Sequence, residues 1–171
     1  MAKRKWLSDD EQRAWRGWIA ATALLDSALD QQLQRDAGIS HATFGILTGL
    51  SQAPGREMHM NELAVLTSSS QSRLSHAVAR LEQARWVTRS RCPANKRQVH
   101  ARLTDAGYEV VRAAAPGHVR RVRELLFDRL TEAQVAQLAE ITGVALKSLA
   151  KAGFADPMPG AADAANAAEL S

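Results

Sequence analysis

The sequence predicts a mainly α-helical fold with a small two- or three-stranded antiparallel β-sheet in the second half of the chain. Apolar residues recur every three or four positions through most of the 171 residues, the spacing that places them on one side of a helix. Two short segments, residues 86–89 and 98–103, instead combine β-branched and aromatic residues around a turn-forming loop. The length suits one domain with its own core.

The first predicted helix begins after Ser8, because a serine followed by glutamate three residues later is a capping box. We expect it to end at Ala37-Gly38. Its expected apolar stripe consists of Trp15, Trp18, Thr22, Leu25, Leu29 and Leu33. Ser40 is expected to cap a second helix that carries Phe44, Leu47 and Leu50. Pro54-Gly55 should stop this helix near Gln52.

The middle of the chain predicts a short helix over 60–66, a serine-rich turn, and a longer helix over 70–84. The buried stripe of the longer helix is expected to contain Leu74, Ala77, Val78 and Leu81. Two strands should follow, joined by a turn that contains Pro93, Ala94, Asn95 and Lys96.

The last third of the chain predicts two helices and a tail. Thr104-Asp105 begins the first helix, whose apolar positions extend to Leu130 and which Pro116 should kink or locally break. Thr131 and Gln134 form a second capping box, which opens the last helix. Residues 153–171 contain few bulky apolar side chains, so we expect a disordered tail there.

Positive charge is concentrated between residues 68 and 103. This segment has eight arginines and lysines against one acid, Glu82, a net charge of +7, whereas the rest of the chain sums to −3. A positive surface on an otherwise mildly acidic protein indicates nucleic-acid binding.

Several other classes of function lack support. The single cysteine, Cys92, cannot form an intrachain disulfide, and the five histidines do not have metal-binding spacings. Phosphate-binding glycine loops and hydrolase motifs are absent from the sequence, so we expect no enzymatic activity, catalytic residue, metal or cofactor. A signal peptide and a membrane-length apolar run are also absent, and we expect a cytoplasmic protein that does not contact membranes.

The order of elements and several short motifs resemble the MarR family (multiple antibiotic resistance regulators). The motifs are Asn61-Glu62-Leu63-Ala64, Ser72-Arg73-Leu74-Ser75, Arg80-Leu81-Glu82, Trp86-Val87, Pro93-x-Asn95-x-Arg97 and Leu103-Thr104-Asp105-Ala106-Gly107, within a similarity that spans residues 15–149. The resemblance implies a winged helix-turn-helix flanked by dimerisation helices. Residues 1–36 would form the N-terminal dimerisation helix, 37–107 the DNA-binding domain, 108–152 the C-terminal dimerisation helices and 153–171 the tail.

Two residues depart from the family pattern. Arg85 stands where the family usually has a glycine that suits a left-handed backbone after the recognition helix, so this arginine should be strained unless the helix ends differently. Asn95 stands where the wing usually has an aspartate. Asparagine accepts only a neutral hydrogen bond from Arg97, which should therefore be held less firmly.

The resemblance implies that the helix over 70–84 enters the DNA major groove while the wing contacts the backbone or the minor groove. The expected contacts are Ser70, Gln71, Ser72, Arg73, His76, Arg80, Arg91, Lys96 and Arg97. A homodimer would then read a pseudo-palindromic operator in double-stranded DNA, most simply as a repressor. A non-specific architectural DNA binder and a winged-helix protein-interaction module are the alternatives.

Family members commonly release DNA when a small aromatic or phenolic molecule binds between the dimerisation helices and the winged domain. The candidate ligand-binding residues are Trp15, Trp18, His41, Phe44, Tyr108 and Arg112. Each has a simpler interpretation, as a core, dimer-interface, surface or salt-bridge residue. Oxidation of Cys92, whose basic neighbours would lower its pKa, is an alternative trigger, although an incidental thiol is the simpler interpretation.

Overall fold

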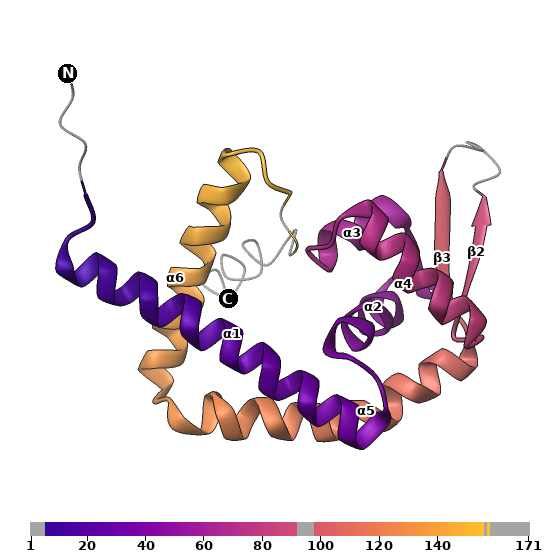
Figure 1. Cartoon of the computed structure of the whole chain (residues 1–171), viewed down its shortest axis with the longest axis horizontal. Coiled ribbons are helices and arrows are strands. Elements are labelled where there is room, and N and C mark those ends of the chain that lie inside the picture. Colours follow the sequence, from indigo (N-terminus) through magenta and orange to yellow (C-terminus); the bar gives the residue numbers. More distant parts are fainter. Residues whose placement is uncertain (1–5, 92–97, 156, 158–171) are drawn as a thin grey trace, which may run out of the picture.

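The computed structural model describes residues 6–91, 98–155 and 157, which form six α-helices, two 3₁₀ turns and three β-strands (Figure 1). In chain order they are α1 (Asp9–Ala37), α2 (His41–Gln52), η1 (Pro54–Arg56), β1 (Glu57–His59), α3 (Met60–Leu66), α4 (Gln71–Gln83), β2 (Val87–Arg91), β3 (Val99–Leu103), α5 (Asp105–Leu125), η2 (Phe127–Arg129) and α6 (Glu132–Lys151).

The fold has two regions. Helices α2, α3 and α4 and the sheet gather at one end and form the winged region, and α1, α5 and α6 extend away from it (Figure 1). The C-terminal part of α1 packs against α5, and α5 begins directly after the last strand of the sheet. Helix α5 therefore connects the two regions.

The sheet has three antiparallel strands in the order β1-β3-β2. Strand β3 pairs with β2 over its whole length, and Met58 of β1 lies opposite Ala101 on its other edge. The structure thus selects the three-stranded alternative. Strand β1 has only three residues, too few to show a periodic pattern in the sequence.

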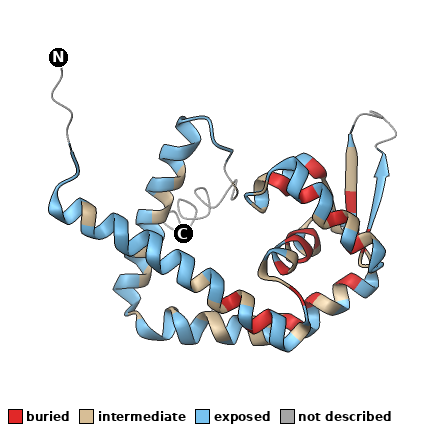
Figure 2. Cartoon of the chain, viewed as in Figure 1, coloured by how far each residue is buried: buried red, intermediate tan, exposed pale blue. Residues whose placement is uncertain are grey.

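The hydrophobic core lies in the winged region and where α1 and α5 meet it (Figure 2). Its largest fully buried side chains are Leu33, Leu47, Leu50, Leu63, Leu74, Val78 and Val87. The expected buried stripe of α4 is confirmed for Leu74, Val78 and Leu81, while Ala77 is partly buried. Packing of this stripe leaves the opposite face of α4 free for contacts with other molecules.

Both predicted capping boxes are confirmed. Ser8 with Glu11 opens α1, and Thr131 with Gln134 opens α6. Gly38 ends α1 in a left-handed conformation with φ 66°. These three boundaries follow from short-range hydrogen bonds to otherwise unpaired backbone groups, which explains why the sequence predicted them.

Helix α5 differs from expectation at two places. It continues through Pro116, so the local break that was one of the two expected outcomes does not occur. Packing holds the helix on both sides of the proline: Val111 and Ala114 are buried before it, and Gly117 lies against α1 after it. The helix also ends at Leu125, so the expectation that it reaches Leu130 is wrong; η2 lies between them.

Some expectations fall outside the described residues. These are the wing turn with Lys96 and Arg97, the Asn95 substitution, Cys92, and most of the expected tail. Among the residues described, no helix is both long and apolar enough to span a membrane.

Candidate nucleic-acid interface

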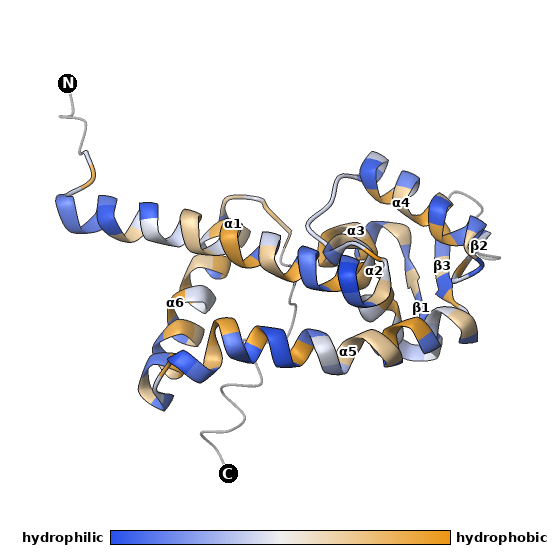
Figure 3. Ribbon diagram, turned by 60° about the horizontal axis from the view of Figure 1, so that its bottom comes forward, coloured by the Kyte–Doolittle hydropathy of each residue, from blue (hydrophilic) through white to orange (hydrophobic). Residues whose placement is uncertain are grey.

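Helix α4 presents a polar N-terminal turn on the surface of the winged region. The Ser70 side chain accepts a hydrogen bond from the Arg73 backbone amide at 3.3 Å and so begins the helix. The turn from α3 is closed by backbone bonds from Thr67 to Leu63 and from Ser69 to Ala64. These contacts fix the direction of α4, which buries Leu74, Val78 and Leu81. Much of the remaining helix is hydrophilic (Figure 3) and exposed.

Every expected DNA-contacting residue that the structure describes is exposed. On α4 and its N-cap these are Ser70, Gln71, Ser72, Arg73, His76 and Arg80, and on β2 it is Arg91. A hollow separates the N-terminal half of α4 from the wing and is lined by residues of α3, α4, β2 and β3, among them Asn61, Gln71, Ser72, Arg89 and Gln98. The N-terminal half of α4 and the wing therefore lie on opposite sides of a hollow that is lined mainly by polar residues.

Glu82, near the end of α4, connects the helix to the wing. One of its carboxylate oxygens accepts the Arg89 backbone amide at 3.0 Å, and the other accepts Arg89 Nε at 2.7 Å. Both side chains are about one-third exposed, so this pair is partly shielded from water. This contact between Glu82 and Arg89, called the brace below, fixes strand β2 relative to α4 and neutralises one of the eight basic charges. The sequence showed Glu82 only as the single acid of the basic segment.

The exit from α4 is strained, as the departure at Arg85 predicted. Arg85 has φ 61°, in the left-handed region where a Cβ is unfavourable, so the expected backbone strain is confirmed. Its exposed side chain adds one cation beside the helix. Two backbone bonds hold the turn, from Arg85 to the carbonyl of Glu82 and from Trp86 to that of Leu81, both at 2.9 Å.

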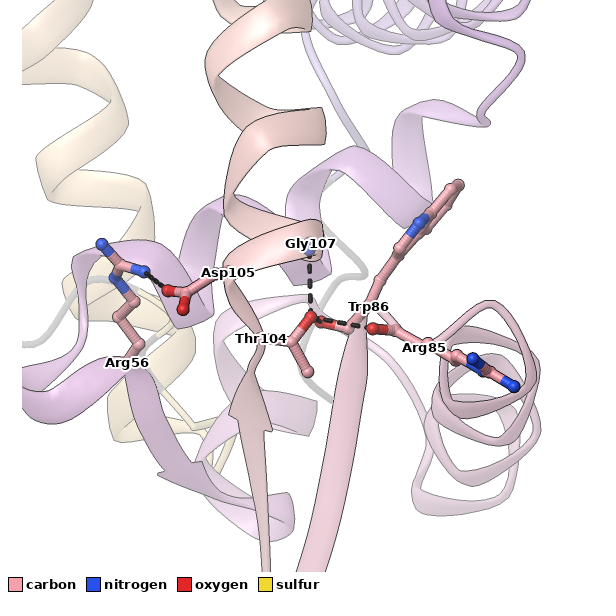
Figure 4. A network of polar contacts seen from close by, with 6 residues as sticks. All are labelled: Arg56, Arg85, Trp86, Thr104, Asp105 and Gly107. Atoms are coloured by element: carbon pink, nitrogen blue, oxygen red, sulfur yellow. Dashed lines mark hydrogen bonds and ion pairs between the residues drawn. The ribbon is translucent and has the colours of Figure 1, made fainter.

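Thr104 attaches this exit to the start of α5 (Figure 4). Its hydroxyl donates to the Arg85 carbonyl at 2.8 Å and accepts the Gly107 amide at 3.0 Å, so it both caps α5 and holds the end of α4. A side chain at Gly107 would overlap the Trp86 carbonyl, so glycine is required for this close approach. The start of α5 and the end of α4 are therefore joined directly, through Thr104 and Gly107.

The candidate ligand-binding residues lie in separate surroundings. Trp15 is 58% exposed on α1, and Trp18 lines a different, apolar hollow. The Arg56 guanidinium lies 3.8 Å from the ring centre of Tyr108. Arg112 donates to Glu109 on its own helix.

His41 and Phe44 of this candidate set both lie beside His118 of α5. The His118 ring centre is 5.4 Å from that of His41 and 4.7 Å from that of Phe44. Burial, and to a lesser extent His41, lower the pKa of His118. His41 itself lies 2.7 Å from Asp26 of α1. The sequence analysis missed His118, because nothing in its local pattern shows that α5 crosses α2 at this point.

The outer helices carry large apolar side chains in solvent. A hollow of about 990 Å³ between α1, the end of α5 and α6 is lined almost wholly by apolar residues, including Leu24, Leu25, Phe127 and Leu138. None of the residues of α6 is fully buried, and Ile141 and Val144 are 59% and 64% exposed.

Nothing in the described part of the chain resembles a metal centre: no group of three or more histidine, cysteine, aspartate or glutamate side chains there is arranged to hold an ion.

The chain resembles known proteins in both sequence and structure. A family model described as MarR family matches residues 37–98, which contain α2 to β2. The sequence is 32% identical over 108 residues to the HTH-type transcriptional regulator PecS of Dickeya dadantii strain 3937, a match that covers 60% of this chain and 62% of PecS.

Two solved structures from Streptomyces coelicolor are similar over most of the chain. Sco3205, a MarR family transcriptional regulator crystallised in complex with DNA, is 49% identical, with a TM-score of 0.82 and coverage of 87% of this chain and 93% of Sco3205. AbsC, another MarR family transcriptional regulator, is 38% identical, with a TM-score of 0.77 and coverage of 86% and 96%.

Proposed function

This chain belongs to the MarR family of transcriptional regulators, and on that premise we propose that it is a homodimeric repressor that binds a pseudo-palindromic operator in double-stranded DNA. One observation supports DNA reading most directly: the exposed N-terminal turn of α4, with Arg73 on it, lies across a polar hollow from the wing. An arginine on a recognition helix can donate two hydrogen bonds to guanine.

The proposed division of labour within this interface follows the position of each residue. Ser70, Gln71, Ser72, Arg73 and His76 lie on the first two turns of α4 or at its cap and would contact bases or phosphates in the major groove. Arg80 lies further along the helix and Arg91 on the wing, where phosphates are the expected partners. Lys96 and Arg97 keep their proposed wing-tip role on sequence grounds alone.

A second copy of the chain is the proposed partner of the outer helices. The apolar hollow between α1, α5 and α6 and the exposed Ile141 and Val144 are more apolar surface than a monomer normally leaves in water. Two-fold pairing through these helices would place two copies of α4 on successive major grooves. Residues 37–107 would be the DNA-binding unit, and 1–36 and 108–152 the dimerisation elements.

Release by a small aromatic or phenolic ligand is the proposed signal. His41 and Phe44 lie with His118 where α2 meets α5, the helix that Thr104 attaches to the exit from α4. A ligand bound there could move α5 and, through it, α4. Trp15, Trp18, Tyr108 and Arg112 lie in other surroundings and would need a change of conformation or a second subunit to join it. Tryptophan fluorescence that never changes across a panel of phenolic acids would contradict this proposal.

The DNA proposal is tested by fluorescence anisotropy with a labelled duplex from the region upstream of the gene, in rising salt and with random-sequence competitor. We expect affinity to fall steeply with salt and the specific duplex to bind at least about 10³-fold more tightly than competitor. Equal affinity for both duplexes would instead show an architectural DNA binder. A lack of binding to either duplex at low salt would indicate a protein-interaction module.

A further inference from the structure

A polar hollow of about 230 Å³ lies where the C-terminal part of α1 crosses α5, away from α4 and the wing (Figure 1). Its lining is Gln32, Arg35 and Asp36 from α1 and Gly117, Arg120, Arg121 and Glu124 from α5. All of these residues lie in the segments proposed above for dimerisation, and none belongs to the DNA interface or to the candidate phenolic-ligand set. The lining has three cations and two acids.

Gln32 is the unusual residue of this hollow, because it is a polar side chain with only 3% of its surface exposed. Its amide nitrogen donates to Asp36 at 2.8 Å. Gly117 makes room for it, because a Cβ at that position would lie 3.2 Å from the same nitrogen. The helices thus approach closely enough to enclose an amide group that water would otherwise solvate.

Two buried polar atoms in this lining lack hydrogen-bond partners among the described residues. One is the acceptor Gln32 Oε1, and the other is the donor Arg121 Nε. A buried polar group without a partner costs about 1–3 kcal/mol, so such groups are usually paired in the working protein. One molecule that both accepts and donates hydrogen bonds would satisfy both atoms.

The charges of the hollow favour an anion. Glu124 accepts a hydrogen bond from Arg121 at 3.2 Å, and Asp36 accepts one from the neutral amide of Gln32. Three guanidinium groups thus stand against two carboxylates, and the lining has a net charge of +1. Arg35 and Arg120 form no ion pair with any residue that the structure describes, and both are exposed. Two arginines without acidic partners beside a buried acceptor resemble the donor set that proteins use to hold carboxylates.

We propose that this hollow binds a small hydroxycarboxylate. Its carboxylate would accept hydrogen bonds from Arg35, Arg120 and Arg121 Nε, and its hydroxyl would donate to Gln32 Oε1. The ligand would bridge α1 and α5, and because it binds only the folded arrangement of these helices, it would stabilise the fold. The site does not depend on the proposed operator binding.

The test is calorimetric titration of the whole protein with L-malate and with succinate, which lacks the hydroxyl, at matched ionic strength. We expect L-malate to bind about tenfold more tightly, because succinate leaves Gln32 Oε1 without a donor. In Gln32→Met, which keeps the length of the side chain but removes its polar atoms, this ratio should fall to about one. A role of Gln32 in packing alone would not change the ratio.

The matched arginine variants locate the carboxylate and remain informative if Gln32→Met fails to fold. Arg120→Ala should weaken L-malate binding about tenfold, whereas Arg129→Ala, which removes an exposed arginine outside the hollow, should leave it unchanged. The proposal is overturned if L-malate gives no more heat than potassium chloride, if Gln32→Met keeps the preference for malate, or if Arg120→Ala binds like the parent protein.

Discussion

The winged region and the outer helices differ in where they place their apolar residues. In the winged region α4 buries Leu74, Val78 and Leu81 and exposes a polar face, whereas α6 leaves Ile141 and Val144 in solvent and buries none of its residues fully. The apolar face of α4 is covered by residues of the same chain, whereas much of the apolar surface of α6 is not. The comparison shows that the winged region has its core within its own chain, while the outer helices leave apolar surface that the proposed second subunit would cover.

The two regions also differ in charge. Residues 68–103 carry +7, and the rest of the chain carries −3. Like charges repel, so the basic surfaces of two copies would stay apart while the apolar outer helices associate. The same contrast separates the proposed DNA surface from the proposed surface for a second subunit, and the variants below test each in turn.

The largest expected effect is on assembly. Ile141→Asp places a charge on the exposed apolar face of α6, and it should weaken dimerisation at least about 100-fold, because an unpaired carboxylate would be buried. Sedimentation equilibrium measures the change. Ala136→Asp, with the same new side chain on another side of α6, should sediment like the parent protein. A monomeric parent protein at micromolar concentration would show that the exposed apolar face of α6 does not serve dimerisation.

The next largest effect is on base recognition. Arg73→Ala should reduce operator affinity about 10- to 100-fold and leave affinity for random DNA nearly unchanged, because a bidentate guanine contact is worth about 1–3 kcal/mol. Anisotropy titrations on both duplexes report the two values. Arg129→Ala serves as the control for loss of one exposed arginine from the outer helices. If both variants titrate the operator alike, Arg73 does not read a base.

A smaller effect is expected from the brace between α4 and the wing. Glu82→Gln removes the charged acceptor of Arg89, so the wing loses its fixed position and one cation is no longer neutralised. The ratio of specific to non-specific affinity should fall about threefold to tenfold, while the salt dependence of non-specific binding becomes steeper by up to about one unit. Glu140→Gln, which removes an exposed acid on α6 outside the hollow between α4 and the wing, is the control. An unchanged ratio would show that Glu82 does not position the wing.

Relief of backbone strain should have a modest effect on stability. Arg85→Gly removes the Cβ from a residue with φ 61° and should raise the free energy of unfolding by about 1 kcal/mol. Urea denaturation measures it, and Gly38→Ala, at φ 66°, should lower stability by a similar amount. A destabilised Arg85→Gly variant would mean that the arginine side chain contributes more than its strain costs.

The smallest effect concerns pH. Burial lowers the pKa of His118 in the folded protein, so on acidification the unfolded chain takes up this proton first. Stability is therefore complete above the ordinary value of about 6.5 and decreases as the pH falls below it. His118→Leu should flatten this dependence in thermal unfolding between about pH 7 and pH 5, and His76→Gln, exposed on α4, should not. A parallel pH profile for His118→Leu would remove His118 as the cause.

The sequence predicted the elements whose signals are local. Ser8, Ser40 and Thr131 each cap a helix through a residue three positions later, and the apolar stripe of α4 repeats every three or four residues. The sequence did not predict contacts between residues that are distant along the chain. Nothing near Glu82 shows that its carboxylate will reach Arg89, and nothing near Gly117 shows that Gln32 will be buried against it.

Pro116 also shows that local sequence signals do not predict long-range packing, because here packing overrides a strong local signal. Its local preference predicts an interrupted helix, but packing of α5 against α1 outweighs that preference. Arg85 is the intermediate case: the family pattern identified a position that needs a left-handed backbone, and the structure adopts it despite the arginine. Local chemistry therefore predicted which residues α4 buries and which it exposes, but not the contacts that hold the helix in place.

The most direct measurement of the central claim is a hydroxyl-radical footprint of the full-length protein on its operator, together with the protein-to-DNA stoichiometry. The account predicts two protomers per duplex and two protected half-sites about 10 base pairs apart, related by two-fold symmetry. One protomer on a single half-site, or uniform protection along the duplex, would contradict it.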